Sequence, residues 1–219
     1  MTTKIDHIVV GAATLADGVA YVKDKLGVDI PKGGEHPNMA THNHLMQLGN
    51  NTFLEIIAIN PDGKPPKRPR WFGLDDPMVR ASIVKPRLLT WVVNTTDLMA
   101  LQTNAAIDIG ERTPLSRGDL NWFFMVPDDG RLLSAGTVPY ALQWQTDEHP
   151  SANMAQLQCQ LKQLRVYHPY ADWYKNVLDS LQASALVSVH DIASTESAYM
   201  IANIETPAGA VELDSRIDR

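Results

Sequence analysis

The stretch KIDHIVV at residues 4–10 predicts a β-strand, with Ile5, His7 and Val9 on one face and the intervening side chains on the other. Residues 15–26, LADGVAYVKDKL, then place apolar side chains at helical spacing, and Gly27 follows as a C-terminal cap. Two further strands are expected at 42–48 and 52–59, joined by a three-residue turn. The unit that decides the fold is therefore strand, helix, strands.

This order of elements recurs twice along the chain. The second copy has a strand at 87–93, a helix near 96–104, and strands near 120–126 and 138–145. The third, looser copy has a strand at 163–167, a helix near 170–181, and strands near 186–190, 199–205 and 210–213. One such unit leaves a face of its small sheet unburied, so two units should pair and enclose a cleft. The predicted divisions are a first module at 1–60, a linker at 61–86, a second module at 87–150 and a third at 158–219.

Composition excludes several classes of protein. The chain has 219 residues, 19 Lys and Arg against 25 Asp and Glu, and a formal charge of −6, so nucleic acid is not an expected partner. The single cysteine, Cys159, excludes an intrachain disulfide and a four-cysteine zinc site. No apolar run approaches the length of a membrane span. We expect a cytoplasmic protein without membrane attachment.

Glu55 is the residue that most needs a partner, because it interrupts the apolar run FLEIIAI at 53–59, and a buried carboxylate is costly alone. The three-residue turn sets Asn43 on the same face as Glu55 and His44 on the reverse face. His7 is the best candidate partner, since imidazole and carboxylate together suit zinc, manganese, iron or nickel. The alternative is a hydrogen-bonded Glu beside an ordinary core His.

Several stretches resemble, in order and spacing, a glyoxalase-like domain of the vicinal oxygen chelate superfamily. In the first module they are DHIVV at 6–10, GGEHP at 33–37, ATHNHLMQLG at 40–49 and FLEII at 53–57. In the second they are SRG at 116–118 before Trp122, and PYALQW at 139–144 before HPS at 149–151. The resemblance covers about residues 4–180. It implies an α+β fold in which repeated βαβββ modules form a curved-sheet cleft.

The resemblance also implies where metal ligands should lie. Superfamily members typically take a His from the first strand and a Glu from the last strand of each of two modules, and His7 and Glu55 match the first pair. Alignment of the second module puts Thr90 and Gln143 at the other two positions, where neither is a good ligand for a transition metal. Glu212, on the last strand of the third module, is the substitute ligand that we predict.

Five residues are predicted to contact a substrate: Asn43, Arg117, Trp122, Gln143 and Trp144. Arg117 favours a carboxylate or phosphate, because its planar fork matches those anions, and the tryptophans provide cleft walls or stacking surfaces. For Arg117 the alternative is an ordinary loop arginine, and for the tryptophans it is the core. The apolar cluster WFGL at 71–74 is a lid over the cleft or, as we favour, a packed connection.

Two functions remain open. In the first, a divalent ion is held by His7 and Glu55 with Glu212, His36 or His42, and Glu55 or a metal-bound water moves a proton, as in a lyase or isomerase acting on a small oxygenated metabolite. In the second, a metal-free cleft binds or sequesters a small molecule. No nucleotide-binding motif is present. A homodimer is expected, because such modules often pair between chains and the third sheet needs a cover.

Overall fold

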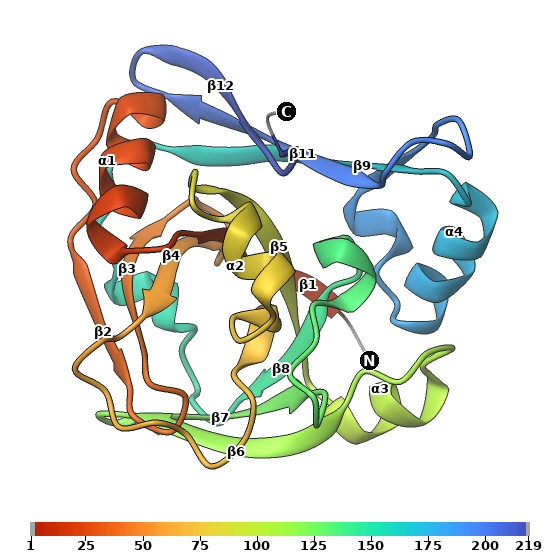
Figure 1. The fold of residues 1–219 in the computed structure, drawn as a ribbon, viewed down its shortest axis with the longest axis horizontal. Coiled ribbons are helices and arrows are strands. Elements are labelled where there is room, and N and C mark those ends of the chain that lie inside the picture. Colours follow the sequence, from red (N-terminus) through yellow and green to blue (C-terminus); the bar gives the residue numbers. More distant parts are fainter. Residues whose placement is uncertain (1–2, 218–219) are drawn as a thin grey trace.

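The computed structural model describes residues 3–217, and these residues form two β-sheets with few helices (Figure 1). The larger sheet has eight strands in the order β2-β3-β4-β1-β5-β8-β7-β6. The smaller sheet has four, in the order β10-β9-β11-β12. The larger sheet curls around the cleft predicted from the repeats, which confirms the α+β class.

The first module follows the predicted order of elements. Its elements are β1 (Thr3–Gly11), α1 (Leu15–Leu26), β2 (Lys32–His36), β3 (Thr41–Gln47) and β4 (Phe53–Ile59). The side chain of Thr14 caps the start of α1, and Gly27 ends the helix at a φ of 70°, where a side chain would be strained. The short strand β2 was expected to be a loop, because its sequence KGGEH lacks the apolar alternation of a strand.

The second module repeats this arrangement. It contains β5 (Arg87–Thr95), α3 (Leu98–Asn104), β6 (Glu111–Arg117), β7 (Leu120–Val126), the 3₁₀ turn η2 (Leu133–Gly136) and β8 (Tyr140–Trp144). Strand β6 was not predicted, because its sequence ERTPLSR is polar and contains a proline. A proline is tolerated there because β6 is the edge strand of the sheet.

The two modules form one continuous sheet. Within each module the first strand runs parallel to the last, β1 beside β4 and β5 beside β8, and β1 pairs with β5 in antiparallel fashion. The linker between the modules contains η1 (Trp71–Gly73) and α2 (Pro77–Ser82) and lies inside the curl (Figure 1). Trp71 and Phe72 are buried, and the Gly73 amide donates to the Gly130 carbonyl at 2.7 Å. The packed connection is therefore confirmed.

The third module keeps the order of elements but changes the strand pairing. After η3 (Pro150–Asn153) it contains β9 (Gln160–His168), α4 (Ala171–Ser180), η4 (Ser184–Leu186), β10 (Ser188–Asp191), β11 (Tyr199–Thr206) and β12 (Gly209–Asp214). Strand β9 lies between β10 and β11, and β12 pairs with β11 alone. In the first two modules the last strand is instead the neighbour of the first, so the third unit is not a structural copy of them.

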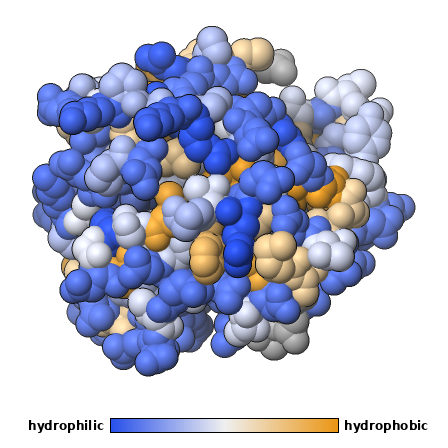
Figure 2. Space-filling view, turned by 90° about the horizontal axis from the view of Figure 1, so that it is seen from below, coloured by the Kyte–Doolittle hydropathy of each residue, from blue (hydrophilic) through white to orange (hydrophobic). Residues whose placement is uncertain are grey.

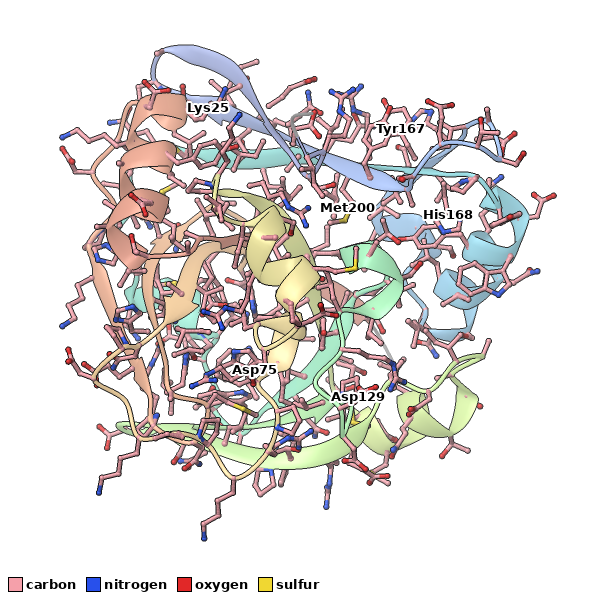
Figure 3. The ribbon with its side chains drawn as sticks, in the orientation of Figure 1. Lys25, Asp75, Asp129, Tyr167, His168 and Met200 are labelled. Carbon is pink, nitrogen blue, oxygen red and sulfur yellow. The ribbon has the colours of Figure 1, made fainter. Side chains whose placement is uncertain are left out.

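The small sheet packs its inner face on the outer side of the large sheet. Met200 of β11 is fully buried between the two sheets, whereas Tyr167 of β9 lies on the outer face (Figure 3). The Tyr174 hydroxyl donates to the Thr137 carbonyl at 2.6 Å, and the Arg87 guanidinium donates to the Ser215 carbonyl at 2.5 Å. One face of the third sheet is therefore covered within the chain, which removes that argument for a homodimer, and the homodimer stays a prediction.

The surface on the side of β6 and β7 is mainly hydrophilic, with small, separated apolar areas (Figure 2). Within residues 3–217, no helix is long and apolar enough to cross a membrane.

Candidate functional site

The concave side of the large sheet contains a narrow pocket, into which the first and second modules and the linker all contribute side chains. Its lining includes His7 of β1, Glu55 of β4, Arg117 of β6, Trp122 of β7 and Trp71 of the linker. The empty space in it, part of which is open to solvent, is about 450 Å³. A ligand that fits this pocket is small.

His7 and Glu55 lie side by side in the pocket, as the sequence predicts. Both are buried, with 5% of each residue exposed, and His7 Nε2 is 3.6 Å from Glu55 Oε2. His7 Nδ1 is 2.6 Å from Asp6 Oδ1. Burial raises the pKa of Asp6, but hydrogen bonds from His149 and His7 outweigh it and hold that pKa well below its usual range. Asp6 is thus a buried carboxylate that accepts a hydrogen bond from His7.

Asn43 connects Glu55 to the edge of the second module. Its Nδ2 donates to Glu55 Oε1 at 2.6 Å, and its Oδ1 accepts from the Gly34 amide at 2.9 Å. Arg117 Nη1 also donates to Asn43 Oδ1, at 3.4 Å. The pairing of Leu45 with Glu55 across β3 and β4 confirms the register that placed Asn43 on this face. The result is a carboxylate fixed by an amide, with a guanidinium beside it.

Aromatic rings make up much of the pocket wall. Trp122 and Trp144 lie 5.3 Å apart, and the Phe53 ring stacks on His7 at 4.4 Å. The Trp71 ring packs against His36 at 5.0 Å, and Trp71 Nε1 is buried without a hydrogen-bond partner. A buried indole N–H normally has an acceptor, so this one is available to a bound molecule or water.

His36 is neutral under ordinary conditions. Burial lowers its pKa to about 4, although the charge of Glu55 opposes that shift. Its Nδ1 lies 3.1 Å from the Thr41 hydroxyl, and its ring meets Trp122 edge-on. His36 therefore contributes a neutral imidazole to the pocket wall.

Two of the predicted positions in the second module face away from the pocket. Gln143 Oε1 accepts from the Leu98 amide at 3.2 Å, and Gln143 Nε2 donates to the Thr96 carbonyl at 3.1 Å. The Thr90 hydroxyl donates to the Gly136 carbonyl at 3.0 Å. The structure brings Leu142 into the pocket in place of Gln143, because successive residues of β8 point to opposite faces. Gln143 caps the start of α3 instead.

Glu212 is not brought to the pocket. It lies on β12 of the second sheet, where Arg165 Nη2 donates to it at 2.5 Å and Asn203 Nδ2 at 3.1 Å. The prediction assumed that the last strand of the third module lies beside the first, as β4 lies beside β1, but β11 separates β12 from β9. The prediction that Glu212 joins His7 and Glu55 as a metal ligand is therefore wrong.

The remaining histidines of the first module also lie elsewhere. His42 lines a separate groove between the start of α1 and α2. His44 points away from Glu55, as predicted, and its Nδ1 is 2.6 Å from the Ile30 carbonyl.

The donor atoms in the pocket do not form a complete metal site. His7 Nε2 and Glu55 Oε2 converge, but a structural or catalytic zinc site has at least three protein ligands. Within residues 3–217, no three His, Cys, Asp or Glu side chains are arranged to hold a metal ion. The side chains at the second pair of expected positions are engaged in other hydrogen bonds, as described above.

Sequence reasoning missed Asp6 and His149. Alternation along β1 put Asp6 on the face opposite His7, but a register shift between Ile5 and His7 breaks the alternation and lets both side chains meet. The signal that could have found Asp6 is the one that found Glu55, since each is an acid within an apolar strand. His149 lies 143 residues from Asp6 in the chain, and no local pattern links them.

Comparison with known proteins gives a family and a fold. Residues 5–181 match the family described as a glyoxalase-like domain. A hypothetical protein from Staphylococcus aureus has a similar structure at 14% sequence identity, with a TM-score of 0.61 over 98% of this chain and 85% of that one. No curated protein matches the sequence.

Further structures are similar at lower scores. The methylmalonyl-CoA epimerase from Mycobacterium tuberculosis is 15% identical, with a TM-score of 0.40 over 68% of this chain and 91% of that one. A hypothetical protein from Bacillus halodurans is 12% identical, with a TM-score of 0.42 over 68% and 97% of the two chains. The match to the family spans most of the chain, and the paired βαβββ modules have the expected order. The chain therefore belongs to the glyoxalase-like domain family of the vicinal oxygen chelate superfamily.

Proposed function

We propose that this protein is a proton-transferring enzyme of the lyase or isomerase type that acts on a small oxygenated metabolite. The observation that carries the proposal is the pair formed by His7 Nε2 and Glu55 Oε2, buried together in the pocket at 3.6 Å. His and Glu are the side chains most used as general acids and bases, and a catalytic pair must lie within reach of one substrate atom.

The hydrogen bonding around the pair supports this role. Asp6 can only accept, so His7 Nδ1 carries a hydrogen, and the Nε2 of a neutral ring has a lone pair directed toward Glu55. Two facing acceptors are unfavourable unless a cation lies between them or one of them is protonated. We infer that the pair holds one proton on His7 Nε2, which leaves the Glu55 carboxylate free as a base.

A substrate placed between these two groups would exchange a proton with them. The C–H bond next to a carbonyl breaks, its proton moves to Glu55, and the electron pair moves onto the carbonyl oxygen, which accepts a hydrogen bond from His7 Nε2. Delivery of a proton to the opposite face of the same carbon gives racemisation, and return of the proton to a different atom gives isomerisation. Loss of a leaving group from the neighbouring carbon gives elimination.

The pocket limits the substrate to a small molecule with an anionic oxygen. Arg117 supplies the cation, and Asn43 fixes both Arg117 and Glu55. The rings of Phe53, Trp71 and Trp122 would enclose the apolar part of the substrate and exclude water. No step of this proposal depends on a metal ion.

The test is deuterium exchange into candidate substrates. The protein is incubated in D₂O with a panel of small 2-oxo acids and hydroxy-carbonyl compounds, and loss of each C–H signal is followed by proton NMR. We expect catalysed exchange in at least one compound and its loss in Glu55→Gln, a variant that keeps the size of the side chain. The matched control is Glu205→Gln, an exposed position on β11.

A binding or sequestering protein is the second candidate, favoured by the aromatic lining and small volume of the pocket. Calorimetry on the same panel separates the two. Saturable binding without exchange, abolished by Arg117→Met, would support sequestration and contradict the enzyme proposal.

A further inference from the structure

Asp6 accepts hydrogen bonds from side chains of both modules. Besides His7, its Oδ2 is 2.7 Å from Trp144 Nε1, 2.9 Å from Asn94 Nδ2 and 3.0 Å from His149 Nε2. Asp6 itself is fully buried, with no exposed surface. We call these five residues the Asp6 cluster.

The two oxygens of Asp6 have different roles. Oδ1 accepts from His7 Nδ1 alone, whereas Oδ2 faces the other three donors. The His149 ring is itself oriented, because its Nδ1 lies 3.3 Å from the Ser151 amide and accepts from it, which leaves the ring hydrogen on Nε2. The three donors near Oδ2 thus fix the orientation of the Asp6 carboxylate, and this orientation directs Oδ1 at His7 Nδ1.

We propose that Asp6 is a positioning residue that keeps a hydrogen on His7 Nδ1, so that Nε2 faces Glu55 and the substrate and is the ring nitrogen that shares a proton with them. The inference rests on the proposed function, in which His7 Nε2 shares a proton with Glu55 and donates a hydrogen bond to the substrate. A carboxylate is required here, because a group with one acceptor and one donor would not satisfy both sides of the cluster. Neutral histidine tautomers are set by the hydrogen bond made by the other ring nitrogen.

The change from Asp6 to asparagine tests this asymmetry. Asparagine has one acceptor oxygen, and the three donors near Oδ2 would keep that oxygen on their side. The amide nitrogen would then face His7 Nδ1 as a donor. His7 would have to accept there and carry its single hydrogen on Nε2, so that the ring loses the Nδ1 hydrogen that Asp6 holds in place in the wild type.

The experiment is long-range ¹H–¹⁵N NMR on ligand-free protein labelled at histidine, with the His7 signals assigned by loss in His7→Gln. We expect a protonated Nδ1 in the wild type, whether or not Nε2 is also protonated, and a neutral ring protonated on Nε2 alone in Asp6→Asn. Asn94→Ala, which removes one donor from Oδ2 without touching His7, should leave the His7 signals in the wild-type pattern.

A wild-type ring with Nδ1 unprotonated would overturn the proposal, and so would a folded Asp6→Asn variant with unchanged His7 signals. The wild-type spectrum decides the first point even if the variant does not fold. Because these spectra need no substrate, the inference about Asp6 can fail or hold independently of turnover. Where exchange activity is found, we expect Asp6→Asn to lower its rate at least about 100-fold, the range of general acid and base contributions.

Discussion

Arg117 is the one arginine or lysine among the residues that line the pocket, within the part of the chain that the structure describes. It comes from the end of the edge strand β6 and reaches Asn43 across the mouth of the curled sheet. A planar guanidinium binds a carboxylate through two parallel hydrogen bonds, which an uncharged side chain cannot replace. At the scale of single residues, Arg117 is therefore the expected determinant of ligand charge.

Arg117→Met should weaken the binding of a small carboxylate by about 10- to 100-fold, since hydrogen bonds to charged groups contribute about 1.5–3 kcal/mol. Calorimetry against the compound found in the exchange panel measures this. The control is Arg112→Met on the same strand, where the guanidinium lies over the Phe123 ring, 4.3 Å from its centroid, and not in the pocket. Equal losses in the two variants would show that the loss reflects net charge and not the site.

Metal content follows from the donors at His7 and Glu55. With two converging donors, we expect zinc, manganese, nickel or iron to be substoichiometric after gel filtration of protein purified without a tag or chelator. Elemental analysis beside the double variant His7→Ala, Glu55→Ala checks this. Stoichiometric metal in the parent, lost in the double variant, would show instead that water or substrate oxygens complete a site around these two residues.

At the scale of elements, the linker is tied across the sheet by Arg68. Its Nη1 donates to the Thr113 hydroxyl at 3.1 Å, and its Nη2 donates to the carbonyls of Val126 and Pro127 at 3.1 and 2.7 Å. These bonds fix the segment that leads into Trp71, and hence one wall of the pocket. The basic, proline-rich linker is thus an ordered part of the site.

Arg68→Met should lower the free energy of unfolding by about 2 kcal/mol, because it removes charge-assisted hydrogen bonds and leaves carbonyl acceptors unpaired. It should also speed amide exchange in residues 70–74. Urea unfolding and hydrogen–deuterium exchange measure the two effects. Lys67→Met, at the exposed neighbouring position, should change neither, and a similar loss there would argue against the tie made by Arg68.

At the scale of the whole molecule, acid should destabilise the fold. The pKa of His36 is about 4 in the folded protein and about 6.5 when the chain is unfolded. Between these two pH values the unfolded state binds more protons than the folded state. The contribution of His36 to the free energy of unfolding is therefore fully present above pH 6.5 and is lost as the pH falls toward 4. Asp6, whose folded pKa is lowered, adds a loss that begins only below its unfolded pKa, near 4.

From the two pKa values of His36 alone, we expect the free energy of unfolding to be about 2 kcal/mol lower at pH 5 than at pH 7. Urea unfolding of the wild type and of His36→Gln at both pH values measures it. We expect the variant to be less stable at pH 7 but to lose about 2 kcal/mol less between the two values. An equal pH dependence in the two proteins would show that His36 is not buried as a neutral ring.

The sequence by itself determined the repeated unit, the extent of α1, the register of β3 and β4, and the meeting of His7 with Glu55. The first three of these features depend on side-chain periodicity and short turns, which act over a few residues. The meeting of His7 with Glu55 was predicted from the cost of burying a lone carboxylate and from the family resemblance. The turn at residues 49–51 decided the register, since Gly49, Asn50 and Asn51 all adopt positive φ values, and that register placed Asn43 beside Glu55.

Only the tertiary structure decided the rest of the site. Leu142 and Gln143 are neighbours in the chain, and the pairing of β8 with β5 and β7 decides which of the two side chains points into the pocket. Glu212 was misplaced because element order does not fix strand order. The Asp6 cluster joins residues up to 143 apart through a register shift in β1, and neither the shift nor contacts at that separation leave a local pattern in the sequence.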